Sequence, residues 1–236
     1  WRQMEAIYGI FERVSQRYPH LQLETCAAGG GRTDIGMVSR FTTTWVTDWN
    51  RLPRMTRILN GMSMALPPEY ISQLAGVSMG GDRGNLDTIM HSLILGHPVI
   101  SGLTPTMAEA NPEVIRRTKH YVNIYKNFIR PFHRESLVYH HTPVIPGIDG
   151  TGWCALEYVA PDRQKAVAAV FRFANAKEDV YRLKFRGLNP DFNYRITFEP
   201  GGRKSKENGN RLMQEGLEVR LDNGLTSVLM LLEIED

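Results

Sequence analysis

Residues able to do chemistry follow two short apolar runs near the start of the chain. The run Leu21–Glu24 leads to Cys26 and then to a loop of small residues, Ala27–Gly31. The run Phe41–Val46 is followed two residues later by Asp48. In parallel α/β folds, the residues that follow the strands share one edge of the sheet, where active sites are built. This stretch therefore predicts an active-site edge that carries Cys26 and Asp48.

Asp48 has two interpretations. A carboxyl group held beside apolar surface loses solvation of its charged form, so its pKa rises and it can donate a proton near neutral pH. Trp45 would supply such a surface. Asp is also a favoured N-cap residue, so a helix cap on a strand-to-helix loop would explain the same residue without catalysis. The spacing alone leaves both interpretations open.

The other reactive residues favour structural roles. Cys26 has no histidine near it in sequence and no electropositive surroundings, so a small pocket wall explains it better than a nucleophile. The Gly29–Gly31 run lacks the spacing of a dinucleotide-binding loop and has no Walker lysine, so it predicts no phosphate site. His140 and His141 are adjacent and would face opposite sides of a strand, so no metal site is expected. No cofactor is expected either.

The order of elements over residues 1–132 predicts a parallel α/β unit that positions these groups. Apolar residues at helical spacing, with Asn111-Pro112 as a helix start, predict helices over about 4–18, 54–59, 86–93 and 112–128. Four parallel strands are predicted side by side in chain order, at Leu21–Thr25, Phe41–Val46, Gly61–Leu66 and His97–Gly102.

The pattern changes near Pro131. Short β-forming runs separated by Gly, Pro, Asn and Asp then continue to the end of the chain. They predict an antiparallel β-sandwich domain over residues 133–236. The expected strands are Leu137–His140, Ala155–Val159, Ala166–Ala174, Val180–Phe185, Tyr194–Phe198, Leu217–Leu221 and Thr226–Ile234. Lys204 and Lys206 are expected in a solvated loop.

Composition narrows the class of protein. The chain has 236 residues, 42% of them hydrophobic, which is typical of a globular protein with a substantial core. The net charge of +3 is too small and too scattered to indicate nucleic-acid binding. The two cysteines are expected to be free thiols. No apolar run predicts a membrane span. The chain opens directly on a helical pattern at Trp1, without a signal peptide, so it is expected to start mid-protein.

Three motifs resemble the C-terminal half of glycoside hydrolase family 36, the α-galactosidase family. Residues 24–34 (ETCAAGGGRTD) are similar to its C-x-S-G-G-G-R-x-D loop, with alanine in place of serine. Residues 45–48 (WVTD) are similar to its W-T-S-D motif and end 22 residues after Cys26. The third signal lies in the tail, at Tyr125-Lys126, Gly187-Leu188-Asn189-Pro190, Tyr194 and Gly216-Leu217.

The resemblance implies a fold and a reaction. The fold is the second half of a (β/α)8 barrel over residues 1–132, followed by the β-sandwich. The reaction is hydrolysis of terminal α-linked galactose with retention of configuration, through two carboxyl groups. Asp48 would be the general acid/base, while Cys26, Gly29, Gly30 and Trp45 would contact the substrate. Arg32 and Asp34 match the motif as well and would brace the loop. Trp45 and Trp49 would either stack on sugar rings or be buried at the barrel rim.

Two departures from the family pattern affect this interpretation. After Asp48 the family continues with more acidic residues, whereas Trp49-Asn50-Arg51 follow here, which would reshape the subsite for the group linked to galactose. A complete barrel takes about 250 residues. The family's nucleophile lies on an earlier strand in a K-x-D motif, and residues 1–132 contain no such motif. The chain is therefore expected to carry half of a catalytic domain.

The implied partners are an α-galactoside oligosaccharide and the missing N-terminal half of the barrel, with assembly into a homo-oligomer left open. Neither nucleic acid nor membrane is an expected partner. Three functions remain open. The first is a retaining α-galactosidase, or a relative that acts on N-acetylgalactosaminides or transfers galactose. The second is a noncatalytic carbohydrate-binding or structural fragment. The third is an unrelated α/β enzyme with a chance motif match.

Overall fold

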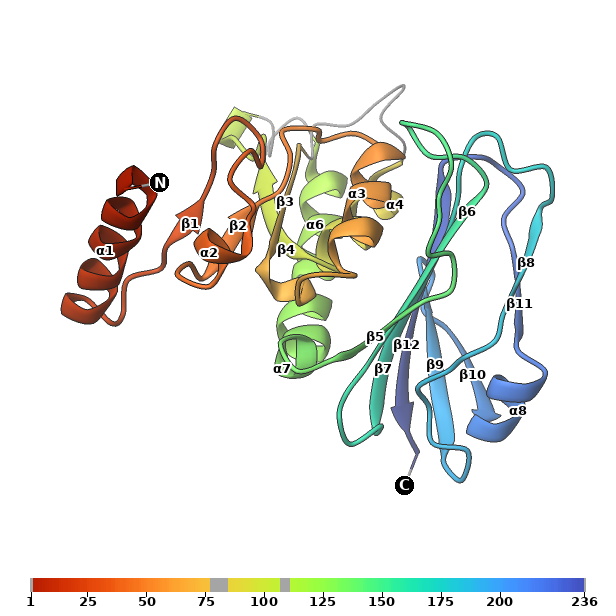
Figure 1. Ribbon diagram of the computed structural model, residues 1–236. Helices are drawn as coiled ribbons and strands as arrows, with labels where there is room; N and C mark the ends of the chain where they lie inside the picture. Colours follow the sequence, from red (N-terminus) through yellow and green to blue (C-terminus); the bar gives the residue numbers. More distant parts are fainter. Residues whose placement is uncertain (1, 77–84, 107–110, 236) are drawn as a thin grey trace.

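The computed structural model describes residues 2–76, 85–106 and 111–235. Its first half contains one parallel sheet with strand order β1-β2-β3-β4 (Figure 1). The strands are β1 (Glu24–Thr25), β2 (Thr43–Trp45), β3 (Ile71–Gly76) and β4 (His97–Ser101). The predicted order and direction of the four strands are confirmed, and so are the positions of all but the third.

The prediction of a strand at Gly61–Leu66 is wrong. The first two of these residues end α3, and the strand lies further on, at Ile71–Gly76. The alternating pattern Met62-Ser63-Met64-Ala65 imitates a strand, although it contains no β-branched residue. The strand β3 lacks a clear apolar pattern because it contains buried polar residues, whose hydrogen-bond partners are distant in sequence. Gln73 Nε2, for example, donates a hydrogen bond to the Met55 carbonyl oxygen at 3.3 Å.

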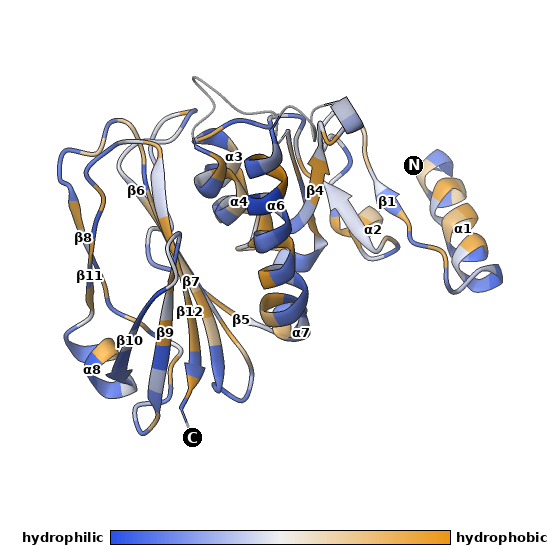
Figure 2. Cartoon of the chain, turned by 180° about the vertical axis from the view of Figure 1, so that it is seen from behind, coloured by the Kyte–Doolittle hydropathy of each residue, from blue (hydrophilic) through white to orange (hydrophobic). Residues whose placement is uncertain are grey.

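Helices α3, α4 and α6 lie between this sheet and the β-rich second half of the molecule (Figure 1). Helix α1 stands at the opposite end of the molecule and contains no buried residue, and its ribbon alternates between hydrophobic and hydrophilic residues (Figure 2). None of the helices in the described residues is both long enough and apolar enough to cross a bilayer. The helices are α1 (Arg2–Arg17), α2 (Ile35–Val38), α3 (Arg54–Met62), η1 (Pro68–Tyr70), α4 (Leu86–Ile94), α6 (Pro112–Ile124), the π-helix η2 (Tyr125–Ile129) and α7 (Arg130–His133).

The second half contains a six-stranded antiparallel sheet in the order β10-β9-β12-β7-β6-β5 and a two-stranded sheet, β11-β8. Each of the seven predicted strands is present, two with the predicted ends and five with ends shifted by one or two residues. The elements are β5 (Leu137–His140), β6 (Trp153–Val159), β7 (Lys165–Arg172), β8 (Val180–Leu183), β9 (Asn193–Glu199), β10 (Arg203–Asn208), α8 (Gly209–Gln214), β11 (Leu217–Arg220) and β12 (Thr226–Ile234).

The expectation of a solvated loop around Lys204 and Lys206 is wrong, because both residues belong to β10. This strand pairs with β9 on one side only, at the edge of the six-stranded sheet. Lysines on an edge strand discourage pairing with another chain. The charged residues therefore belong to an edge strand that resists pairing with another chain. An edge strand of this kind and a solvated loop have similar compositions, so the sequence did not distinguish them.

The central strands of the six-stranded sheet are buried on both faces. In β7, Val167, Ala169 and Phe171 pack in one apolar cluster with the helices of the first half. The alternate residues Ala168 and Val170 pack in a second cluster with β8, β11 and α8. Because successive strand residues point to opposite faces, a sheet covered on both sides reads as an uninterrupted apolar run.

Polar groups also join the two halves. Buried His91 of α4 lies with Nδ1 2.7 Å from the Ser227 hydroxyl of β12. Burial lowers the pKa of His91 to about 3, so its imidazole is neutral near pH 7. On the same helix, Asp87 accepts hydrogen bonds from Arg117 and Tyr121 of α6. The His91–Ser227 contact thus fixes α4 against the second half, and the bonds to Asp87 fix α6 against α4.

Candidate active site

The loops that follow β1 and β2 meet at one edge of the parallel sheet. After β1, Cys26 is exposed and the chain turns through three residues with positive φ, namely Ala28 (48°), Gly29 (69°) and Gly30 (99°). The Gly31 N–H closes the turn by donating to the Ala27 carbonyl oxygen at 2.8 Å. After β2, Val46 is buried and Asp48 is exposed. The predicted edge carrying Cys26 and Asp48 is thus present.

The glycines let the first loop pack directly against the second. A Cβ atom added to Gly29 would lie 2.8 Å from the Asp48 side-chain carboxyl carbon. A Cβ atom added to Gly30 would lie 2.3 Å from the Val46 carbonyl oxygen. No side chain fits at either position, so Gly29 holds the backbone in contact with Asp48 and Gly30 holds it against the end of β2.

Asp48 is oriented by Trp45, the last residue of β2. Trp45 is partly buried, and its indole Nε1–H donates a 2.9 Å hydrogen bond to Asp48 Oδ1. Only Oδ1 takes part in this bond, and Oδ2 accepts no hydrogen bond from Trp45 or from the N-terminus of a described helix. The helix-cap interpretation of Asp48 is wrong, because the next helix, α3, begins at Arg54 and has Pro53 at its N-cap.

A second aspartate of the same stretch does cap a helix. Asp34 is the N-cap of α2 and accepts from the Met37 N–H at 3.0 Å. Its other neighbour is the Tyr8 hydroxyl of α1, at 3.3 Å. Asp34 therefore ties the loop to two helices, as expected of a bracing residue.

Asp48 lies in a cleft of about 480 Å³. Gly29 and Asp48 line it from the two loops, and Trp49, Arg54 and Ile148 also line it. Of the other residues singled out from the sequence, Cys26, Gly30 and Trp45 are not among those lining this cleft. Gly30 and Trp45 act on it through Val46 and Asp48, and Cys26 lies at the start of the same loop.

Of the remaining residues that line the cleft, the sequence pointed to Trp49 but to neither Arg54 nor Ile148. Trp49 is 40% exposed, and the guanidinium carbon of Arg54 lies 3.7 Å from the centroid of its ring. Arg54 is held in turn by Asp149, with Nε and one terminal nitrogen 2.9 Å and 2.6 Å from Oδ1. Asp149 is 95 residues away in sequence, in the connection between β5 and β6. No local pattern links such a pair.

Metal chemistry has no support in this part of the chain. Within residues 2–76, 85–106 and 111–235, no three histidine, cysteine, aspartate or glutamate side chains gather as metal ligands. What the cleft offers is one exposed carboxyl group oriented by an indole, beside a backbone surface made of glycine. A single oriented carboxyl group can transfer a proton to or from a bound substrate.

Two protein-family models match the chain. Residues 1–127 match the model described as "Melibiase", and residues 153–232 match "Glycosyl hydrolase family 36 C-terminal domain". Among curated proteins, α-galactosidase 1 of Pediococcus pentosaceus is 27% identical over 222 residues, which are 91% of this chain and 28% of that protein. The α-galactosidase of Escherichia coli is 27% identical over 204 residues, 82% of this chain and 27% of that protein.

Solved structures share the fold. The α-galactosidase from Lactobacillus brevis superposes with a TM-score of 0.79 at 23% identity, covering 98% of this chain and 31% of that one. AgaA from Geobacillus stearothermophilus gives a TM-score of 0.77 at 24% identity, covering 97% of this chain and 31% of that one. Variants of AgaA have been solved with stachyose and with 1-deoxygalactonojirimycin. The chain thus spans less than one third of the length of these relatives.

Proposed function

The chain belongs to the melibiase family, and from this premise we propose that it carries the acid/base half of the active site of a retaining α-galactosidase. The observation that carries the proposal is the placement of Asp48. It is an exposed carboxyl group in a cleft, oriented by Trp45 and packed against Gly29. The substrate would be an oligosaccharide ending in α-linked galactose, as the names of the relatives and the stachyose complex of AgaA suggest.

In the proposed reaction Asp48 acts twice. It first donates its proton to the glycosidic oxygen as the bond from C1 to that oxygen breaks and a carboxylate nucleophile bonds to C1. It then accepts a proton from the water that attacks C1 and releases galactose, which returns the nucleophile to its free form. Retention requires the two carboxyl groups to lie about 5 Å apart. In this reaction the hydrogen bond from Trp45 would orient the Asp48 carboxyl group toward the bond being cleaved.

Cys26, Gly29 and Gly30 are assigned to the galactose pocket. Their loop begins at the end of β1 and reaches Asp48, so a sugar bound over it would present its anomeric carbon to the acid. The absence of side chains at the glycines lets sugar hydroxyls approach the backbone closely. An exposed, small thiol such as that of Cys26 suits a pocket wall.

The fold is interpreted in the same terms. Residues 1–132 would be the second half of a (β/α)8 barrel and residues 133–236 a β-sandwich domain. The first half of the barrel would supply the nucleophile and pair with the parallel sheet along β1 and β4, the two strands that have one neighbour each in the described residues. We call the protein containing both halves the full-length enzyme.

The proposal is tested by incubating the full-length enzyme with melibiose, raffinose and stachyose, and with matched β-galactosides and α-glucosides. We expect galactose release from the α-galactosides alone, with the α-anomer appearing first in the proton NMR spectrum. Release of β-galactose first would contradict the retaining mechanism. Failure to cleave any α-galactoside, in a protein with a cooperative thermal transition, would favour the noncatalytic alternative.

The loop packing makes a separate prediction about stability. Gly30→Ala in the full-length enzyme should lower the free energy of unfolding, because positive φ costs a non-glycine residue about 1–3 kcal/mol and overpacking adds ~1–3 kcal/mol. Gly61→Ala is the matched control: it lies in α3 with nothing within 4 Å of its new Cβ atom. That substitution should stabilise the helix by about 0.5–1 kcal/mol. Urea unfolding measures both, and an equal response would contradict the described loop.

A further inference from the structure

The part of the cleft lined by Trp49, Arg54 and Ile148 is built from both halves of the chain. Trp49 and Arg54 come from the segment between β2 and α3, whereas Ile148 and Asp149 come from the connection between β5 and β6. Arg54 links the two groups, since it stacks on Trp49 and forms an ion pair with Asp149. The side chain of Arg54 is only 23% exposed, so the stack is held in one place.

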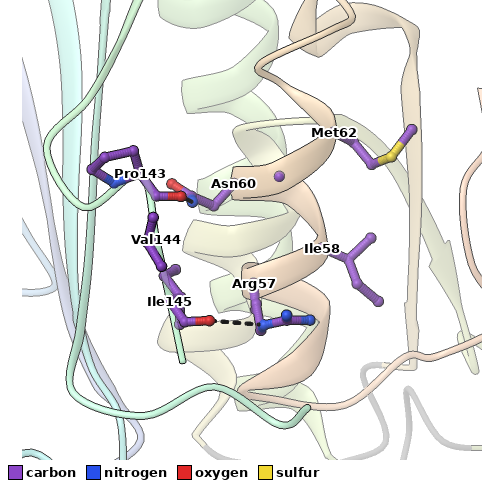
Figure 3. Close-up of a pocket in the computed structure, with 8 residues that line it drawn as sticks. Arg57, Ile58, Asn60, Met62, Pro143, Val144 and Ile145 are labelled. Atoms are coloured by element: carbon purple, nitrogen blue, oxygen red, sulfur yellow. Dashed lines mark hydrogen bonds between the residues drawn. The ribbon is translucent and has the colours of Figure 1, made fainter. Parts of the chain in front are cut away.

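The β5–β6 connection is fastened along α3 rather than being a free loop. Arg57 Nε donates to the Ile145 carbonyl oxygen at 3.1 Å (Figure 3), and Asn60 Nδ2 donates to the Thr142 carbonyl oxygen at 3.2 Å. With the Arg54–Asp149 pair, these contacts anchor the connection over a full turn and more of the helix. Ile148 remains 69% exposed although it lines the cleft.

The position of this wall relative to Asp48 indicates what it would bind. The general acid protonates the glycosidic oxygen, so the galactose ring lies on one side of Asp48 and the leaving group on the other. In the proposed function the galactose side is that of Gly29 and its loop, which packs against Asp48, and Trp49 is the residue directly after Asp48. The wall formed by Trp49, Arg54 and Ile148 therefore faces the leaving group.

The chemistry of the wall fits a sugar ring. One face of the Trp49 indole is covered by Arg54, and the exposed remainder of the ring, with Ile148, offers apolar surface to the C–H face of a pyranose. The guanidinium N–H groups of Arg54 can donate to sugar hydroxyls. Asp149 pairs with Arg54 and is not among the residues that line the cleft, so it would act through Arg54 as a positioning residue.

We propose that Trp49, Arg54 and Ile148 form the subsite for a hexose leaving group, with Arg54 positioned by Asp149 of the antiparallel half. The inference rests on the proposed α-galactosidase function. It means that the second half of the chain selects the substrate and does more than cover the helices.

The test compares two substrates in the full-length enzyme. Melibiose places a glucose unit in the subsite, whereas α-galactosyl fluoride releases fluoride and leaves the subsite empty. Trp49→Ala should lower kcat/KM for melibiose by about 10–100-fold, the usual effect of removing a contacting tryptophan. It should leave kcat/KM for the fluoride, and inhibition by free galactose, within about twofold. Asp149→Asn should act in the same direction by about 3–10-fold, because Arg54 loses a charge-assisted hydrogen bond.

Asp179→Asn is the matched control, since Asp179 forms an exposed ion pair with Arg220 far from the cleft in sequence. It should alter neither substrate. Equal losses on melibiose and the fluoride in Trp49→Ala would overturn the subsite, and so would unchanged kinetics on both. If the unmodified enzyme cleaves neither substrate, the proposed function itself fails, which separates that outcome from failure of the subsite.

Discussion

Replacing Asp48 by alanine in the full-length enzyme is expected to slow the glycosylation step on melibiose by about 10²–10⁴-fold, the usual contribution of general acid catalysis. The sugar leaving group of melibiose is a poor one and must be protonated as the bond breaks. An aryl α-galactoside with a nitrophenol leaving group needs no such proton. Its first step should therefore be much less affected in the same variant. Burst-phase kinetics on the two substrates measure this difference.

The second half-reaction gives an independent readout of the same substitution. Without a base to deprotonate water, the glycosyl-enzyme should accumulate, and turnover of the aryl substrate should be limited by its hydrolysis. Azide carries no proton to be removed, so it should restore turnover and yield the α-galactosyl azide. Equal losses on both substrates, with no azide product, would remove Asp48 from the chemistry.

Asp34→Ala provides the control for a purely structural role. Asp34 caps α2 and bonds to Tyr8, so its loss should cost about 1 kcal/mol of stability. Any effect on activity should then be the same for melibiose and for the aryl substrate. A leaving-group dependence in Asp34→Ala as strong as that in Asp48→Ala would show that the assay does not isolate acid catalysis.

The isolated 236-residue chain is expected to show no turnover of any α-galactoside. One carboxyl group of the required pair is missing in the proposed mechanism, and β1 and β4 each lack a second neighbour in the described residues. Open sheet edges and uncovered apolar surface favour association. The purified chain should therefore self-associate or be poorly soluble, as light scattering would measure.

Adding the missing half provides the positive arm of this experiment. Co-expression of the segment that precedes this chain in the full-length enzyme should recover galactose release and a soluble complex. The same segment co-expressed with an Asp48→Ala chain should recover the complex but not the activity on melibiose. Steady turnover by the 236-residue chain alone would overturn the assignment of the nucleophile to the other half.

The parts of this fold that could be predicted from sequence are those in which local pattern and burial agree. The central antiparallel strands are apolar and buried, His97–Ser101 is a compact apolar run that is only partly buried, and the segment opened by Asn111-Pro112 has a helix start. Ile71–Gly76 was missed because buried Ser72 and Gln73 interrupt its apolar character, and their partners come from distant elements.

The site was predictable to the same degree. Cys26, Gly29 and Asp48 stand close to recognisable strand ends, so their shared edge follows from short-range order. The contact between Arg54 and Asp149 depends on how the β5–β6 connection crosses α3. Nothing local encodes it, since an arginine and an aspartate on exposed segments are common in any globular protein.

The burial of the six-stranded sheet on both faces has a consequence for how this protein can diversify. Alternate residues of each central strand contribute to two different interfaces, one with the helices and one with β8 and β11. Deleting or inserting one residue within β7 would move the side chains that follow it to the opposite face of the sheet and so disrupt both interfaces. If the β region were replaced by that of a distant homologue, its side chains would not be complementary to those of α3 and α4 unless these helices were replaced with it. We therefore expect functional recombinants to exchange the helices and the sheet together. Their crossover points should lie before α3 rather than after α7, where the antiparallel half begins.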